Sequence, residues 1–304
     1  MPLQRRRRIG DFMAASIIEL LKKKKPLLWD GGMGTELIAR GLTSDTLPEL
    51  WNIERPDDVR AIHAAYYAAG AVAAQSNTFG GHPMKLEAGG LADRTEELNR
   101  AGAMLVVEAR PKGKIAVGDI GPCGAMLAPV GDADPTVVKD GFRRQAQALA
   151  QGGVDVIHIE TMFDLQEIVL AIEAALETGL EVMASMTFEK AARGFFTIMG
   201  ISPQRAAGEL AAVGAVVVGA NCSIGPADMV ELIREFRKFT AVPLIAQANA
   251  GKPRIEGGKV LYDVGAEEFA SFAPLLADAG ADIIGGCCGA TPEFIGKMSA
   301  KLKK

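Results

Sequence analysis

Short apolar runs alternate with amphipathic stretches along most of the 304-residue chain. The runs are rich in Val, Ile and Ala and lack strict polar alternation, which is typical of parallel strands buried on both faces. Strands are predicted over residues 27–29, 71–75, 115–120, 154–161, 182–187, 216–222, 243–249 and 281–287. Most of these runs end in polar or glycine-rich segments, so each strand is predicted to open into a loop.

The stretches between the strands carry apolar residues at helical spacing. They predict helices over residues 57–70, 94–110, 137–152, 164–178, 203–213, 226–239, 266–279 and 292–302. An eight-fold strand–helix alternation over about 250 residues has the size and order of an α/β protein of the (β/α)8 TIM-barrel type. We therefore predict one barrel over residues 27–304, preceded by an N-terminal extension, residues 1–26, whose helix over residues 11–21 caps the bottom of the barrel.

Composition and charge limit the classes of protein to which the chain can belong. With 49% hydrophobic residues, 23% charged residues and a net charge of -4, the chain is typical of globular proteins that do not bind nucleic acid. The basic runs at residues 5–8 and 22–25 are interpreted as solvated segments. Asp11 and Glu19 interrupt the apolar stretch between these runs, so neither a signal peptide nor a membrane span is expected. We expect a cytoplasmic protein.

Polar residues gather at the predicted strand ends. In a TIM barrel the functional site lies at the C-terminal ends of the strands. The residues predicted there are Asp30, Asn77, Asp119, Glu160, Thr187, Asn221, Cys222, Gln247, Asn249, Cys287 and Cys288.

Three of these strand-end residues are cysteines. Cys287 and Cys288 lie between glycines, and alone they are also compatible with small buried residues in a packed turn. Cys222 ends another strand, and strands six and eight share one rim of the barrel. Three thiols leave one position open on a tetrahedral zinc, the pattern of a catalytic site, and sulfur favours zinc over magnesium or calcium. Cys123 is interpreted as a buried neutral cysteine.

Six motifs together resemble the homocysteine S-methyltransferase family, and most of all the homocysteine-binding barrel of cobalamin-dependent methionine synthase. They are Asp-Gly-Gly-Met-Gly-Thr (30–35), Asn-Thr-Phe-Gly (77–80), Gly-Asp-Ile-Gly-Pro (118–122), Ile-Glu-Thr (159–161), Gly-Ala-Asn-Cys (219–222) and Gly-Gly-Cys-Cys-Gly (285–289). The resemblance implies that Cys222, Cys287 and Cys288 hold zinc. It also implies that Asp30, Gly31 and Glu160 bind the amino acid part of homocysteine, and Asn221, of the matching Asn-Cys pair, is a further substrate-binding candidate.

The chemistry of sulfur agrees with this implication. A free thiol with a pKa near ~8.5 is mostly protonated at neutral pH, whereas a thiol on zinc is deprotonated. Such a thiolate attacks a methyl group, and homocysteine would become methionine. Two structural alternatives remain: Glu160 pairs with a lysine or arginine, or Asp30 only stabilises its own turn. His158, inside strand four, is interpreted as a core histidine.

The methyl donor is a separate question. The cobalamin-ligating motif D-x-H-x-x-G is absent, because none of His63, His82 and His158 has aspartate two positions before it. The sequence continues for one predicted helix beyond Cys288, so we expect no cobalamin domain within it. We expect methylcobalamin on a separate corrinoid protein that docks at the barrel mouth, with S-methylmethionine or a betaine as the alternative donor.

Two other classes of function remain open. An aldolase-like barrel enzyme would grip phosphate with the glycine-rich loops after strands seven and eight. A non-catalytic protein would only bind zinc or homocysteine. Zinc analysis tests the first alternative, and a methyl-transfer assay tests the second.

Overall fold

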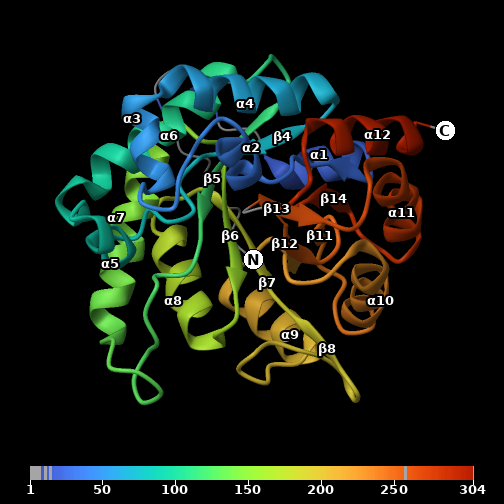
Figure 1. Cartoon of the computed structure of the whole chain (residues 1–304). Coiled ribbons are helices and arrows are strands. Elements are labelled where there is room, and N and C mark those ends of the chain that lie inside the picture. The colour runs from blue at the N-terminus through green and yellow to red at the C-terminus, as the bar shows by residue number, and fades with distance from the viewer. Residues whose placement is uncertain (1–7, 10–11, 14–15, 257–258, 304) are drawn as a thin grey trace.

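Eight parallel strands form a barrel in the computed structural model, which describes residues 8–9, 12–13, 16–256 and 259–303 (Figure 1). The sheet order is β3-β14-β11-β10-β7-β6-β5-β4. A hydrogen bond from Val72 N to Leu28 O, at 2.7 Å, links the two ends of this sheet. The strands are β3 (Leu27–Leu28), β4 (Ala73–Gln75), β5 (Ile115–Ile120), β6 (Val156–Met162), β7 (Glu181–Met186), β10 (Val217–Asn221), β11 (Leu244–Ala248) and β14 (Ile283–Gly286).

Eight helices surround the barrel, so the predicted TIM-barrel fold is confirmed. They are α4 (Pro56–Ala69), α6 (Thr95–Ala109), α7 (Pro135–Gln151), α8 (Leu165–Leu176), α9 (Pro203–Val213), α10 (Pro226–Arg237), α11 (Ala266–Asp278) and α12 (Pro292–Leu302). Proline at the first helical position and side-chain caps mark several starts; Ser202, for example, accepts a hydrogen bond from Arg205 N. In the described part of the chain, no helix is long and apolar enough to cross a membrane.

The loops contain short elements that the hydrophobic pattern did not predict. Two are hairpins: β8 (Glu189–Ala191) with β9 (Gly194–Phe196), and β12 (Pro253–Glu256) with β13 (Lys259–Tyr262). The others are α2 (Met33–Ala39), α3 (Trp51–Glu54), α5 (Pro83–Leu86) and the 3-10 turns η1 (Pro48–Leu50), η2 (Glu87–Gly89) and η3 (Ala92–Arg94). Elements this short show too few repeats of a helix or strand period to be recognised.

The first helix begins later than predicted. Helix α1 covers Ile17–Lys23, whereas Phe12–Met13 forms strand β2, paired with β1 (Arg8–Ile9); positions 10–11 and 14–15 lie outside the described residues. The start is set by Ser16, whose hydroxyl accepts from Glu19 N and donates to the Glu181 carboxylate at 2.6 Å. Glu181 also accepts from Ile17 N at 2.6 Å. A local sequence pattern cannot predict a contact between residues so far apart in the chain.

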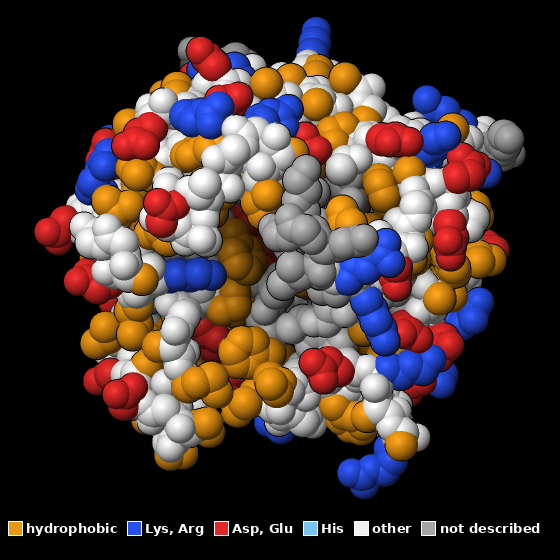
Figure 2. Space-filling model, in the orientation of Figure 1, with side chains coloured by type: hydrophobic (Ala, Val, Ile, Leu, Met, Phe, Trp, Pro, Cys, Tyr) orange, Lys and Arg blue, Asp and Glu red, His pale blue; other side chains and the backbone are white. Residues whose placement is uncertain are grey.

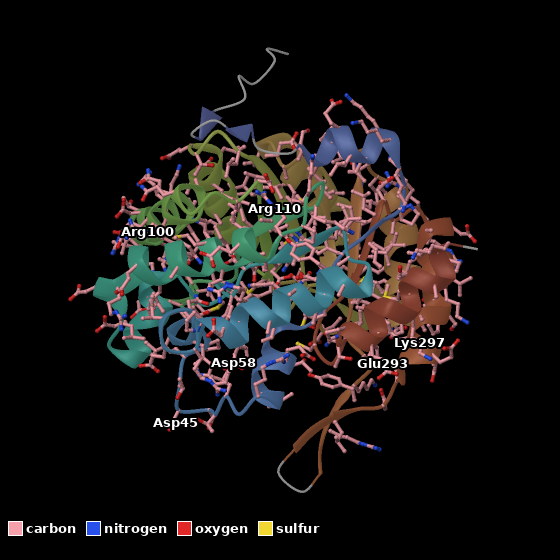
Figure 3. The ribbon with its side chains drawn as sticks, turned by 90° about the horizontal axis from the view of Figure 1, so that it is seen from above. Asp45, Asp58, Arg100, Arg110, Glu293 and Lys297 are labelled. Carbon is pink, nitrogen blue, oxygen red and sulfur yellow. The ribbon has the colours of Figure 1, made fainter. Side chains whose placement is uncertain are left out.

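Helix α1 closes the bottom of the barrel, as predicted. Ile17 and Leu21, 0% and 3% exposed, pack in one cluster with inward-facing strand residues such as Trp29, Met183 and Ile283. Figure 3 shows α1 and hairpin β12–β13 at opposite ends of the molecule. The hairpin therefore belongs to the end where the strands finish.

Candidate metal centre and substrate pocket

A cavity of about 350 Å³ lies where the strands end. Figure 2 shows a hollow near the middle of the face that carries hairpin β12–β13, with hydrophobic side chains along its rim. The lining combines three thiols, several acidic side chains and an apolar mouth. It includes Met33, Ile38, Leu47, Glu49, Phe79, Lys85, Asp119, Glu160, Cys222, Tyr262, Cys287 and Cys288.

The three predicted cysteines meet in this cavity. Their sulfur atoms lie within 4.8 Å of one another, and Cys222 Sγ is 3.8 Å from Cys288 Sγ. A tetrahedral zinc with bonds of about 2.3 Å separates its sulfur ligands by about 3.8 Å. In the part of the chain that the structure describes, no other group of three or more His, Cys, Asp or Glu residues is arranged to hold a metal. The donor set therefore fits zinc in chemistry and spacing.

Backbone contacts position the cysteines. Cys222 has a left-handed φ of 61° at the end of β10, and its N–H donates to Gln247 O at 3.0 Å. After β14, Cys287 N donates to Ala248 O at 2.8 Å, and Cys288 N donates to Asn249 Oδ1 at 3.2 Å. Successive residues of a strand face opposite sides, so it is the turn that lets both thiols reach one point.

The three thiols shift one another's pKa values. Contact with the Cys287 and Cys288 thiols lowers the pKa of Cys222, and the same contacts raise the pKa values of Cys287 and Cys288. Two thiols thus hydrogen-bond to a first thiolate, and burial opposes further ionisation. A cluster that readily forms only one thiolate by itself needs a cation to hold three.

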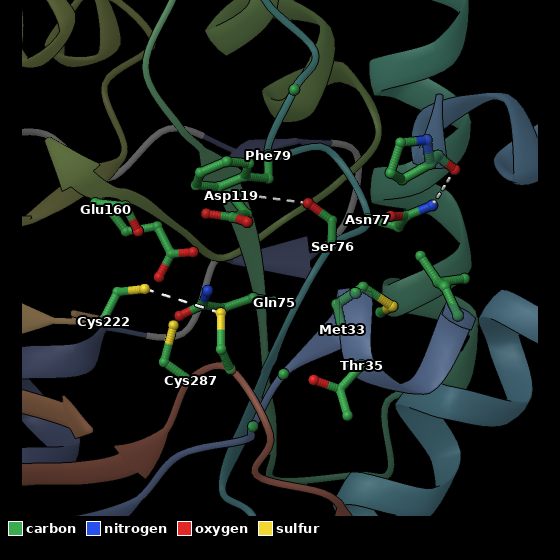
Figure 4. Close-up of a pocket in the computed structure, with 18 of the residues that line it drawn as sticks. Met33, Thr35, Gln75, Ser76, Asn77, Phe79, Asp119, Glu160, Cys222 and Cys287 are labelled. Carbon is green, nitrogen blue, oxygen red and sulfur yellow. Dashed lines mark hydrogen bonds between the residues drawn. The ribbon is translucent and has the colours of Figure 1, made fainter. Parts of the chain in front are cut away.

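Two predicted carboxyl groups lie close to the cysteines and lack a basic partner. Figure 4 shows Glu160, Cys222 and Cys287 side by side. Glu160 is 8% exposed, burial raises its pKa to about 8, and no salt bridge among the described residues joins it to lysine or arginine. Burial raises the pKa of Asp30 to about 7. Its Oδ2 accepts from Gln75 N at 2.7 Å, and its buried Oδ1 has no partner.

Asn221, which does not line the cavity, orients Glu160 through a hydrogen bond. Its Nδ2 donates to Glu160 Oε2 at 3.0 Å and to Thr161 Oγ1 at 2.7 Å, while its Oδ1 accepts from Thr161 N at 2.8 Å and from Ser185 Oγ at 2.7 Å. Asn221 is fully buried, and these bonds occupy its amide atoms. They also secure Thr161, which has a left-handed φ of 59°.

The turn after β3 is packed directly on the turn after β14. A Cβ atom on Gly31 would lie 2.2 Å from Ala290 O, so only glycine fits there. Gly32 N donates to Ala290 O at 2.9 Å, and Gly289 N donates to Thr35 Oγ1 at 2.9 Å. No side chain caps α2 at Gly32, which leaves backbone amides of its first turn available on the pocket wall.

Not every strand-end residue faces the cavity. Those that line it are Asn77, Asp119, Glu160, Cys222, Gln247, Cys287 and Cys288, whereas Asp30, Thr187, Asn221 and Asn249 do not. His158 is buried, with Nδ1 2.8 Å from Gln75 Oε1 and Nε2 3.0 Å from Ser185 Oγ, as expected of a core histidine. Cys123 is buried outside the cluster, and burial raises its pKa to about 12.

Sequence reasoning missed three residues of the site, and it placed Asp119 at a strand end without giving it a role. Gln75, in β4, holds the segment after β3, since its Oε1 accepts from Trp29 Nε1 at 2.8 Å and its N–H donates to Asp30 Oδ2. Glu49 and Tyr262 lie in the short elements η1 and β13, where no motif distinguished them.

The chain is similar to known proteins over most of its length. A family model described as homocysteine S-methyltransferase matches residues 27–302. The methionine synthase of Mycobacterium tuberculosis is 30% identical over 298 residues, which cover 92% of this chain and 25% of that protein. The methionine synthase of Mycobacterium leprae is 28% identical, over 92% of this chain and 24% of that protein. This chain thus spans about a quarter of the length of these curated relatives.

A solved structure is similar over nearly its full length. The crystal structure of the homocysteine methyltransferase MmuM from Escherichia coli, in its metallated form, superposes with a TM-score of 0.78 at 26% identity. The match covers 93% of this chain and 98% of that one.

Proposed function

Because this chain belongs to the homocysteine S-methyltransferase family, we propose that it transfers a methyl group to the sulfur of homocysteine and forms methionine. One observation gives the proposal its strongest support. Three thiols and the buried carboxyl group of Glu160 line a single pocket, and Asp30, next to the lining residue Gly31, has a buried oxygen without a partner. The two features match the two ends of one small amino acid, its thiol and its ammonium group.

We assign the zinc ligands to Cys222, Cys287 and Cys288. The 3.8 Å separation of two of these sulfurs and the chemistry of the donor set support the assignment. When bound, zinc would keep the substrate thiol deprotonated at neutral pH, where a free thiol is mostly protonated. The turn geometry after β10 and β14 presents the three side chains to one side of the pocket, where a substrate sulfur can approach.

The other residues bind and orient the amino acid. Asp30 and Glu160 accept hydrogen bonds from its ammonium group, which supplies the positive charge that both carboxyl groups lack. Asn221 acts through Glu160 by fixing the position of its carboxylate. Gly31 and the uncapped first turn of α2 bind the substrate carboxylate through backbone amides. Holding the molecule at both charged groups places its sulfur beside the cysteines.

Two kinds of methyl donor are proposed. The first is methylcobalamin on a separate corrinoid protein that docks at the pocket mouth, which the resemblance to methionine synthase implies. The second is a small donor, and a specific observation favours it: the pocket contains two further buried carboxyl groups, Glu49 and Asp119, each with an oxygen that has no partner.

The test is a methyl-transfer assay with zinc-loaded protein and homocysteine. Methylcobalamin, S-methylmethionine and glycine betaine are supplied separately, and methionine is measured. Methionine formation with at least one donor, and none when cysteine replaces homocysteine, supports the proposal. Zinc-loaded protein that binds homocysteine but forms no methionine with any donor would be a binding protein, and the proposed activity would be rejected.

A further inference from the structure

Tyr262 of hairpin β12–β13 lies on the wall of the pocket, beside the turn that follows β14. Its ring packs directly on the backbone of this turn: a Cβ atom on Gly289 would lie 2.5 Å from the ring and 2.8 Å from Ala250 Cβ. Gly289 also has a left-handed φ of 82°, which favours glycine. Because Gly289 has no side chain, the ring can lie close to the neighbouring residue, Cys288.

Hydrogen bonds tie the base of the hairpin to the cysteine turn. Ala250 N donates to Cys288 O at 2.9 Å. On the other side of the hairpin, Asp263 accepts from Lys252 N through Oδ1 at 2.8 Å, which closes the base next to Tyr262. Figure 3 shows the hairpin at the end of the molecule where the strands finish. The segment that carries Tyr262 is therefore fixed relative to the metal centre.

The phenol oxygen of Tyr262 lies nearer to Cys288 than to the other two thiols. Burial raises the pKa of Tyr262, and the charge of Cys288 and a hydrogen bond to its sulfur raise this pKa further. Cys222 and Cys287 also raise it, through their charge. Cys288 Sγ is thus the sulfur that the hydroxyl can reach.

The other two thiols each have a polar side chain beside them. Asn221 Nδ2 lies 4.0 Å from Cys287 Sγ. Asn249 hydrogen-bonds to Cys222 through its side chain. Hydrogen bonds to the ligands of a metal fix the orientation of those ligands and tune the metal. Tyr262 would complete the set, because it supplies a partner for the third thiol.

We propose that Tyr262 is a positioning residue of the metal centre, whose hydroxyl donates a hydrogen bond to Cys288 Sγ when this sulfur is a thiolate. This inference rests on the zinc site of the proposed function. A phenol with an ordinary pKa near ~10 keeps its proton at neutral pH, and hydrogen bonds to charged acceptors are the stronger ones. The bond holds the Cys288 side chain in its ligand orientation and offsets part of the negative charge of three thiolates.

The first test measures zinc affinity without turnover. Zinc is titrated into the full chain in competition with a chelator of known affinity. Tyr262→Phe keeps the ring but loses the hydroxyl, and it should weaken zinc binding by about 10- to 100-fold, the usual effect of removing a hydrogen bond to a metal ligand. Tyr67→Phe is the matched control, since Tyr67 is a buried tyrosine outside the pocket lining whose hydroxyl donates to Ile115 O at 2.6 Å. The control should bind zinc as the unsubstituted protein does.

The second test uses Co²⁺ in place of zinc as a spectroscopic probe. A thiolate that loses a hydrogen bond gives up an electron more easily, so the sulfur-to-cobalt charge-transfer band of Tyr262→Phe should move to longer wavelength. The band of Tyr67→Phe should stay in place. A substitution that only loosens the fold would lower the melting temperature without moving this band.

Two results would reject the role of Tyr262 and leave the proposed function standing. They are zinc affinity and a cobalt spectrum in Tyr262→Phe that equal those of the unsubstituted protein, or a loss of zinc affinity that is as large in Tyr67→Phe. An unsubstituted protein that binds neither metal would contradict the proposed zinc site itself, and this inference with it.

Discussion

Acidic side chains at the two ends of the barrel differ in their hydrogen bonding. At the bottom, Glu181 accepts hydrogen bonds from α1, and Asp155 and Asp282 are paired with arginines and backbone amides. At the top, Asp30, Asp119 and Glu49 each have a buried oxygen without a partner. We therefore expect the top of the barrel, unlike the bottom, to gain hydrogen bonds when a ligand binds.

The backbone shows the same contrast. The non-glycine residues with left-handed φ in the described chain are Thr161, which precedes Met162 at the end of β6, and Cys222 and Ser223, which follow β10. All three lie at the top of the barrel. Each such residue costs about 1 to 3 kcal/mol. The closely packed cluster at the bottom has no such residue, so we expect stability to depend more on the bottom and function more on the top.

Metal removal should give the largest effect and should be confined to the top. Dialysis against a chelator is expected to lower methyl transfer by more than about a thousandfold, because thiolate formation and orientation are both lost. The melting temperature should change little, and zinc but not magnesium should restore activity. Unfolding of the chelated protein would show that the two ends are not separate.

Leu21→Ala should affect the bottom alone. Leu21 is 3% exposed in the bottom cluster, and truncation of a buried leucine costs about 2 to 5 kcal/mol of unfolding free energy. Denaturant titration measures this loss. Activity and zinc content per folded molecule should match those of the unsubstituted protein, and a marked change in the KM for homocysteine would contradict the comparison.

Glu160→Gln should weaken homocysteine binding but should not lower the unfolding free energy as Leu21→Ala does. Loss of a charge-assisted contact is expected to cost about 1.5 to 3 kcal/mol of homocysteine binding. Calorimetry gives the affinity, and metal analysis should find the zinc content unchanged. If homocysteine binds as tightly as before, Glu160 has only a structural role.

The pH dependence of homocysteine binding should be the smallest effect. Burial raises the pKa of Asp30 to about 7, and the ammonium group of the substrate favours the charged carboxylate. Binding therefore releases a proton, and affinity should rise at least about tenfold from pH 6 to pH 8. Glu160, with a pKa of about 8, acts in the same direction. Asp30→Asn should make the rise in affinity smaller, and an affinity that falls over this range would contradict the assignment.

The barrel could be predicted because its signal is local and repeated. Each strand has its own apolar run, and each helix has its own spacing and start signals, so the eight units support one another. The meeting of Cys222 with Cys287 and Cys288 followed from topology, because parallel strands of a barrel all end at one rim. The late start of α1 could not be predicted, since Glu181 fixes it from across the molecule.

Glu49 and Tyr262 also escaped prediction, for a physical reason. Glu49 lies in a short 3-10 turn and enters the pocket through its contact with Gly80 N. Tyr262 reaches the wall from hairpin β12–β13, and its ring packs where a Cβ atom on Gly289 would lie, 2.5 Å away. The positions of these side chains depend on how the loops fold over the barrel, and the periodicity of the sequence does not predict loop conformation.

The central claim is that three cysteines hold the metal that activates homocysteine. The most direct measurement is zinc content and methyl transfer in the Cys222→Ser, Cys287→Ser and Cys288→Ser proteins, with Cys123→Ser as the matched control. The account predicts about one zinc per chain and full activity in the control, but loss of both zinc and activity in each of the other three, with the barrel still folded. Full activity in any one of those three proteins would contradict it.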